Sequence, residues 1–135
     1  MGSSGLTFGA VAIGGAIGSM ARLAVGTAIQ QRVGTGFPLG TLVINITGSL
    51  AIGLFIGVAL DTPAVTPTLR AFLTTGVCGG YTTFSAFSYD AVVLIDEGAY
   101  GRAALYVLAS VTLSILGALA GVSAARWLLN VVRGR

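Results

Sequence analysis

Gly76-Val77-Cys78-Gly79-Gly80-Tyr81-Thr82-Thr83-Phe84-Ser85-Ala86-Phe87-Ser88 is the stretch that decides the fold, because it interrupts a long apolar segment. Three glycines are followed by a dense group of hydroxyl side chains and by two phenylalanines three residues apart. A glycine costs about 1 kcal/mol relative to alanine inside a helix. Unwound backbone at membrane depth is tolerated only where protein or a water-filled cavity covers it. The stretch therefore predicts a broken membrane helix that contacts a polar ligand, most simply an ion.

The composition is that of a membrane protein. Hydrophobic residues make up 55% of the 135 residues and charged residues only 8%, whereas soluble domains average about 25% charged residues. The net charge is +3, and the seven basic residues are all arginines scattered at segment ends. A nucleic-acid partner would require a cluster of basic residues, which this chain lacks, so we expect no nucleic-acid partner. The sequence predicts a multi-pass membrane protein in contact with the lipid bilayer.

The residues needed for catalysis are missing. The four acids lie at segment ends, and the chain has no histidine or lysine to act as a general base. Cys78 is the only cysteine, which excludes an intrachain disulfide and, without histidine, makes a zinc or haem site implausible. We therefore expect no enzyme activity, and we interpret Cys78 as a small packing residue.

Four apolar segments are long enough to cross a bilayer, which takes about 20 residues. They run from about 6 to 30, 39 to 60, 71 to 95 and 103 to 128, and the broken stretch lies in the third. Together they consume nearly the whole chain, which predicts a single four-helix transmembrane domain over residues 1–135. The expected fold is an all-α integral membrane protein of four transmembrane helices, with the third helix broken at mid-membrane.

Small and polar residues recur every four positions, which places them on one helical face. The three sets are Ala10, Gly14, Gly18 and Arg22; Asn45, Ser49, Gly53 and Gly57; and Gly117 and Gly121. Helix packing explains the glycines. Arg22 is the only basic residue well inside a span, and such residues usually face a bundle interior or a wet cavity, which indicates a vestibule. Asn45 either bonds a neighbouring helix or lines a polar path.

A hydroxyl stripe and an aromatic pair indicate an anion pathway. Tyr106, Ser110 and Ser114 are four residues apart and form one stripe on the fourth span. An aromatic ring has a positive edge, so Phe84 and Phe87 can attract a small anion without trapping it. Conduction requires binding that is strong enough for entry and weak enough for exit. The residues leave open that the two rings merely pack.

The distribution of arginines predicts that the chain inserts in both orientations. Four arginines fall on the side of the termini (Arg70, Arg126, Arg133 and Arg135) and three on or near the other (Arg22, Arg32 and Arg102). The positive-inside rule then gives almost no bias. An antiparallel dual-topology homodimer closed by twofold symmetry is the expected assembly, with the pore where two subunits meet.

Three motifs, taken together, resemble the CrcB/Fluc family of fluoride channels. They are the sequences at 14–22 (GGAIGSMAR), 40–48 (GTLVINITG) and 79–88 (GGYTTFSAFS), one in each of the first three spans. The resemblance extends over all four spans in order. It implies a fluoride-selective channel that exports cytoplasmic fluoride passively through two pores at an antiparallel dimer interface.

The resemblance also assigns roles to residues of this sequence. The implied fluoride-pore residues are Asn45, Phe84, Ser85, Phe87, Tyr106, Ser110 and Ser114. Arg22 would lie at a pore vestibule. A structural sodium ion would be bound at the dimer interface by the backbone carbonyls of Gly79 and Thr82. The family often has threonine where this chain has Ala86, so one hydroxyl is lost beside the rings.

Two other functions remain to be weighed. A small dual-topology, proton-coupled exporter of the multidrug type would also have four spans, but it needs a membrane-embedded carboxylate. Asp90 is the only candidate in this chain. A structural or regulatory membrane subunit without transport of its own would need neither the hydroxyl stripe nor the broken helix.

Overall fold

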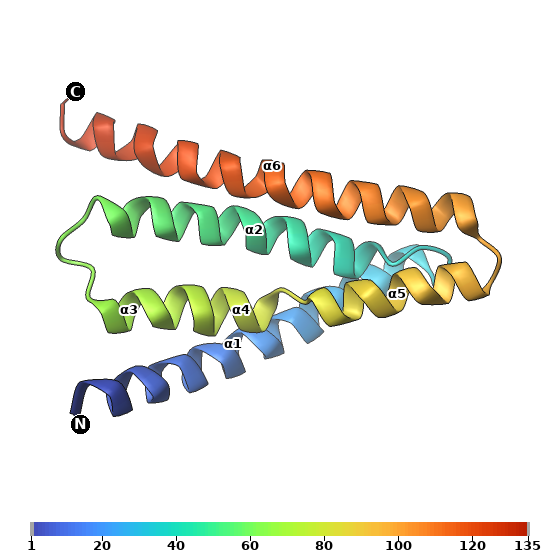
Figure 1. Ribbon diagram of the computed structural model, residues 1–135, viewed down its shortest axis with the longest axis horizontal. Helices are drawn as coiled ribbons and strands as arrows, with labels where there is room; N and C mark the ends of the chain where they lie inside the picture. The colour runs from blue at the N-terminus through green and yellow to red at the C-terminus, as the bar shows by residue number, and fades with distance from the viewer. Residues whose placement is uncertain (1, 135) are drawn as a thin grey trace.

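The computed structural model describes residues 2–134 and consists of four helical passes that alternate in direction (Figure 1). The elements are α1 (Gly2–Val33), α2 (Leu39–Leu60), α3 (Pro67–Ala71), the π-helix η1 (Phe72–Cys78), α4 (Gly79–Tyr81), α5 (Phe84–Asp96) and α6 (Tyr100–Val132). Elements α3 to α5 form the third pass. Both termini and the α2–α3 connection lie at one end of the bundle. Among the described residues there is no strand, so the predicted all-α class is confirmed.

Three of the helical segments are long and apolar enough to cross a membrane: Ser4–Val33, Leu39–Leu60 and Tyr100–Val132. The third pass is divided into shorter elements. The first and last helices extend several residues beyond the spans expected from hydropathy alone. Pro38 lies at the N-cap position, one residue before α2 begins, and its dihedral angles are not helical (φ −80°, ψ 61°).

The small-residue face of α2 packs against α6, and this is the most extensive helix contact in the bundle. A Cβ on Gly53 would overlap the backbone carbonyl of Ala118. A Cβ on Gly121 would in turn overlap the carbonyl of Leu50. The predicted packing role of these glycines is confirmed, because only a residue without a side chain allows the two backbones to come this close.

The glycine face of α1 packs in the same way against the third pass. A Cβ on Gly14 would lie 2.7 Å from the Phe72 carbonyl oxygen, and one on Gly18 would overlap the carbonyl of Val77. The contact is mutual, since a Cβ on Gly76 would lie 3.0 Å from the Cα of Gly14. This face of α1 therefore holds η1 and α4 at backbone contact distance.

The helical backbone of the third pass is interrupted at the two threonines and not at the glycines before them. Gly79 has helical dihedral angles (φ −64°, ψ −37°), and α4 runs through Gly80 to Tyr81. Thr82 and Thr83 are extended, with ψ angles of 159° and 116°. Gly76 and Gly80 both face α1 at close range, so these two glycines serve packing, and the helical geometry is interrupted only at the threonines.

A small core lies between α2, α5 and α6, towards the end of the bundle away from the termini. Its buried members are Leu42, Phe87, Ala91, Leu94, Ala103 and Tyr106. Many large apolar side chains on the outside of the bundle are exposed, including Phe8 on α1 and Leu108 on α6. Such an apolar exterior suits contact with lipid or with another membrane subunit.

Candidate functional site

A groove with a volume of about 350 Å³ runs between α2, the third pass and α6, and we call it the central groove. Most of the residues that the sequence singled out line it: Asn45, Gly79, Thr82, Phe84, Phe87, Ser110 and Ser114. The three remaining expected site residues do not line the central groove: Arg22, Ser85 and Tyr106. Residues from three segments far apart in the chain thus converge on one concave surface.

The two phenylalanines of the central groove have different environments. Their ring centroids are 5.4 Å apart and the ring planes are inclined by 45°. Phe87 is buried, and its ring centroid lies 5.4 Å from that of Tyr106. Phe84 is 78% exposed. One ring therefore belongs to the core of the bundle, whereas the other projects from it.

Ser110 has a buried hydroxyl that makes no hydrogen bond of good geometry within the described residues, although the Tyr106 hydroxyl, one turn earlier on α6, is close enough to interact with it. Buried polar groups are nearly always hydrogen-bonded, so an orphaned hydroxyl on the wall of a groove marks a position for a ligand or water. Ser114 lies one turn further along α6 and is half-buried on the same wall.

Tyr106, the first residue of the hydroxyl stripe, does not line the central groove. It is fully buried, and its hydroxyl donates a hydrogen bond of 3.2 Å to Oδ2 of Asp90. The ring also makes an edge contact with Phe37, with the centroids 5.6 Å apart. The sequence placed Asp90 near the end of the third span without indicating a partner, and the structure gives it a tyrosine hydroxyl. No spacing rule links two residues on different helices.

Asn45 is engaged on both sides of its carboxamide by the backbone of one residue. Its Nδ2 donates to the Thr83 carbonyl over 3.0 Å, and its Oδ1 accepts from the Thr83 N–H over 2.8 Å. Thr83 caps α5, since its Oγ1 accepts from the Ala86 N–H at 3.1 Å. Ser85, which is exposed, shares a hydrogen bond of 3.2 Å with the same Thr83 hydroxyl.

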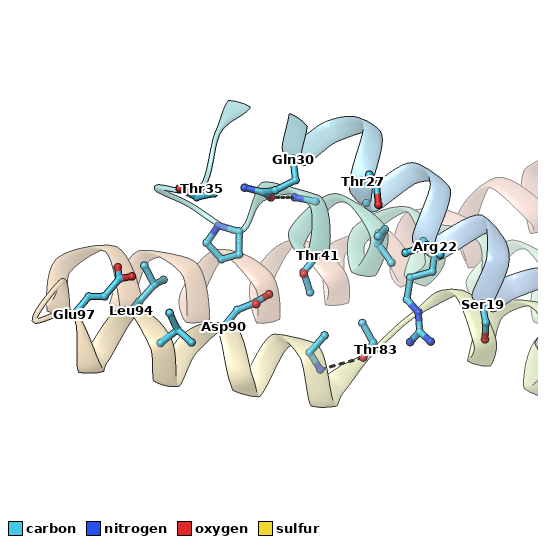
Figure 2. Close-up of a pocket in the computed structure, with 17 residues that line it drawn as sticks. Ser19, Arg22, Thr27, Gln30, Thr35, Thr41, Thr83, Asp90, Leu94 and Glu97 are labelled. Carbon is cyan, nitrogen blue, oxygen red and sulfur yellow. Dashed lines mark hydrogen bonds between the residues drawn. The ribbon is translucent and has the colours of Figure 1, made fainter. Parts of the chain in front are cut away.

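A second and larger cavity, of about 690 Å³, opens beside the central groove, and we call it the polar cavity (Figure 2). Arg22 projects into it from α1 towards the Thr83 segment, while Asp90 and Glu97 lie progressively nearer its other end. Thr83 lines both cavities and so stands between them. Sequence reasoning did not select Thr83, because its importance depends on which cavities meet at its position.

Comparison with known proteins identifies the family. The family model described as "CrcB-like protein, Camphor Resistance (CrcB)" matches residues 9–122. The chain belongs to the CrcB family. A CrcB relative from Nitrobacter hamburgensis, named "Fluoride-specific ion channel FluC 1", is 49% identical over 117 residues, which cover 87% of this chain and 93% of the relative. Relatives named "Fluoride-specific ion channel FluC" are 46% identical in Rhodopseudomonas palustris (90% and 98% covered) and 48% identical in a Ruegeria species (89% and 94% covered).

Membership of the CrcB family, together with three apolar helices of spanning length, makes this chain a multi-pass protein of the plasma membrane. The matched region begins in α1, ends within α6 and therefore includes the whole central groove. The polar cavity falls inside the same region, from Ser19 to Glu97. Both cavities are thus features of the part of the chain that the CrcB family shares.

The carbonyls of Gly79 and Thr82 are two of those that lose their helical partners at the interruption in this CrcB chain. In an α-helix the N–H of Thr83 would donate to Gly79 and that of Ala86 to Thr82. Here those two groups donate to Asn45 Oδ1 and to Thr83 Oγ1. The Thr82 carbonyl accepts a long hydrogen bond of 3.4 Å from Arg22 Nη1. Gly79 is exposed and Thr82 is half-buried.

Proposed function

We propose that this chain is a fluoride-selective channel that lets cytoplasmic fluoride leave passively down its gradient. The relatives that share nearly half of its residues carry the name of a fluoride-specific ion channel, which is not the name of an enzyme. The single observation in the structure that carries the proposal is the unpartnered hydroxyl of Ser110 on the wall of the central groove. A buried donor without a protein acceptor is suited to a small anion.

The chemistry of the central groove supports selectivity for a small anion. Phe84 and Phe87 offer ring edges with partial positive charge, which attract an anion weakly. Ser110 and Ser114 provide hydroxyl donors one helical turn apart on the opposite wall. Donors alternating with ring edges replace part of the hydration shell and bind an ion loosely enough to release it. Arg22, at the polar cavity, supplies a positive charge that raises the local concentration of anions.

The working unit in this proposal is an antiparallel dual-topology homodimer with two pores. Phe84 is 78% exposed in the single chain, and a half-open groove cannot shield an ion from lipid. A second copy related by twofold symmetry would cover Phe84 and close the groove, once for each copy. The interruption at Thr82 and Thr83 then falls at mid-membrane, where extended backbone is tolerated because the partner covers it.

A structural sodium ion at the twofold axis completes the proposal. Sodium prefers hard oxygen ligands, as do the other hard cations that proteins bind through carbonyl groups. The carbonyls of Gly79 and Thr82 fit this requirement, because the amides that would satisfy them in a continuous helix donate elsewhere. The same pair from the second copy would complete the ligand set. Bound there, the cation would hold the two interrupted segments together.

The test is halide efflux from proteoliposomes that contain the purified protein. We expect fast fluoride efflux and very little chloride efflux, because the smaller fluoride ion accepts stronger hydrogen bonds from the hydroxyl donors of the central groove. Equal efflux of both halides would reject fluoride selectivity. Protein-free liposomes give the background leak.

A proton-coupled exporter of the multidrug type is the alternative, and it depends on Asp90. This carboxylate lines the polar cavity but accepts a hydrogen bond from the buried Tyr106 hydroxyl, which leaves it less available for proton exchange with a substrate. A pH gradient that drives uptake of a cationic dye into proteoliposomes would favour the exporter. Failure of every ion and dye to move would favour a subunit without transport of its own.

A further inference from the structure

Asn45 lies on α2, and its side chain reaches across to the one place where the third pass leaves helical geometry. Both the oxygen and the nitrogen of its carboxamide bond the backbone of Thr83, at 2.8 and 3.0 Å. This pairing copies the way in which one strand bonds another. It fixes Thr83 in the extended conformation that the residue has here (φ −153°, ψ 116°).

We propose that Asn45 is a positioning residue that holds the third pass open at Thr82 and Thr83. This inference rests on the proposed function for its purpose, and it gives Asn45 a role other than direct contact with fluoride. Its carboxamide oxygen takes the N–H that a continuous helix would direct to Gly79. The two hydrogen bonds between the Asn45 side chain and the Thr83 backbone, which we call the Asn45 clamp, thereby compete directly with helix formation at this point.

The hydroxyl of Thr83 diverts a second backbone N–H from its helical acceptor. By accepting from the Ala86 N–H at 3.1 Å, it acts as the N-cap of α5 and diverts that N–H from the Thr82 carbonyl. Two side-chain oxygens, Asn45 Oδ1 and Thr83 Oγ1, thus replace two backbone carbonyls as hydrogen-bond acceptors. Both the Gly79 and the Thr82 carbonyls are freed from helical hydrogen bonds as a result, and the Thr82 carbonyl accepts the long bond from Arg22. These are the two oxygens that the proposed cation site requires.

The clamp also sets the direction of α5 and hence the position of both rings. Phe84 is the first residue of α5, directly after the clamped Thr83, and Phe87 follows one turn later. A helix continued through Thr83 would rotate both rings relative to α6, where Ser110 is located. Asn45 therefore connects the cation site, the aromatic pair and the hydroxyl wall through a single pair of hydrogen bonds.

A neighbouring contact on α2 supplies a matched control. Thr47 Oγ1 shares a hydrogen bond of 3.1 Å with the hydroxyl of Tyr81, the last residue of α4. That bond joins the same two passes only two residues away, but it involves side chains alone. The substitution Thr47→Val removes it without touching the backbone of Thr82 or Thr83.

The experiment measures the backbone conformation of the two threonines by NMR in lipid bilayers, with ¹³C and ¹⁵N labels on threonine. The ¹³Cα and carbonyl shifts of Thr82 and Thr83 are expected to be extended in the wild type and in Thr47→Val. In Asn45→Leu, which has nearly the same shape but no polar atoms, they are expected to move to helical or averaged values. Unchanged extended shifts in Asn45→Leu would overturn the proposal.

A second variant and a flux measurement keep the outcome clear. If Asn45→Leu does not fold, Asn45→Asp at neutral pH replaces it. This substitution keeps the shape of the side chain and removes the amide donor, so the carbonyl shift of Thr83 should move. An unchanged shift rejects the clamp. Reduced fluoride efflux with unchanged threonine shifts would make Asn45 an ion ligand only. Because the shifts do not depend on transport, a wild-type protein that passes no fluoride would reject the channel and leave this test intact.

Discussion

The rings of Phe84 and Phe87 lie 5.4 Å apart, yet Phe87 is buried in the bundle and Phe84 is 78% exposed. The pair therefore spans the boundary between the core of one chain and whatever covers the central groove. Loss of the exposed ring should impair transport without disturbing the fold of the chain, because the side chain contributes little to the core.

The first prediction concerns Phe84→Ile. We expect fluoride efflux to fall at least about tenfold, the equivalent of about 1.4 kcal/mol in a barrier, because an aliphatic side chain has no positive edge. The thermal stability of the purified protein should stay close to that of the wild type. Phe8→Ile, which alters a similarly exposed ring on α1, is the control and should conduct normally. Unchanged efflux in Phe84→Ile would mean that the rings only pack.

The second prediction sets transport against stability at Ser110. An unpartnered buried hydroxyl costs about 1–3 kcal/mol, so Ser110→Ala should leave the melting temperature unchanged or raise it. Fluoride efflux should nevertheless fall about tenfold, equivalent to about 1.4 kcal/mol. Circular dichroism melting in detergent and the efflux assay give the two readouts. Ser123→Ala, at an exposed position on the same helix, should change neither; a Ser110→Ala protein that is destabilised but transports normally would contradict the ligand role.

The third prediction compares two glycines on α1. A Cβ on Gly18 would meet the Val77 carbonyl and lie 2.8 Å from the Tyr81 amide nitrogen, whereas one on Gly15 would meet nothing within 4 Å. Gly18→Ala should therefore destabilise the bundle by about 1–3 kcal/mol. Gly15→Ala should be neutral or gain up to about 1 kcal/mol from helix propensity. Equal melting temperatures for the two variants would show that α1 does not pack against η1 and α4 in this register.

The fourth prediction concerns the charge of Arg22. Arg22→Gln removes the positive charge and keeps a polar, though shorter, side chain at this position. Fluoride efflux at low ionic strength should fall severalfold, and the difference from the wild type should shrink above about 0.1 M salt, where the Debye length is about 10 Å. Arg32→Gln, at the end of α1 outside the polar cavity, serves as the control. A deficit that is independent of salt would contradict an electrostatic role.

One wall of the central groove could be predicted from spacing, because that wall belongs to a single helix. Ser110 and Ser114 share a face of α6 whatever surrounds them, and both line the groove. The glycine faces of α1 and α2 were predictable for the same reason. Tyr106 shows the limit of this reasoning: it belongs to the same stripe, but its hydroxyl is bonded to Asp90 on α5 and it does not line the groove.

By itself, the sequence determined the membrane location, the number and direction of the helical passes and the faces on which small residues pack. These features depend on composition and on the 3.6-residue period, which are local properties. Only the tertiary structure decided that the third pass leaves helical geometry at Thr82 and Thr83 and not at its glycines. The reason is that the partner for the Thr83 backbone is Asn45, 38 residues earlier and on another helix. No local preference specifies a hydrogen bond of that kind.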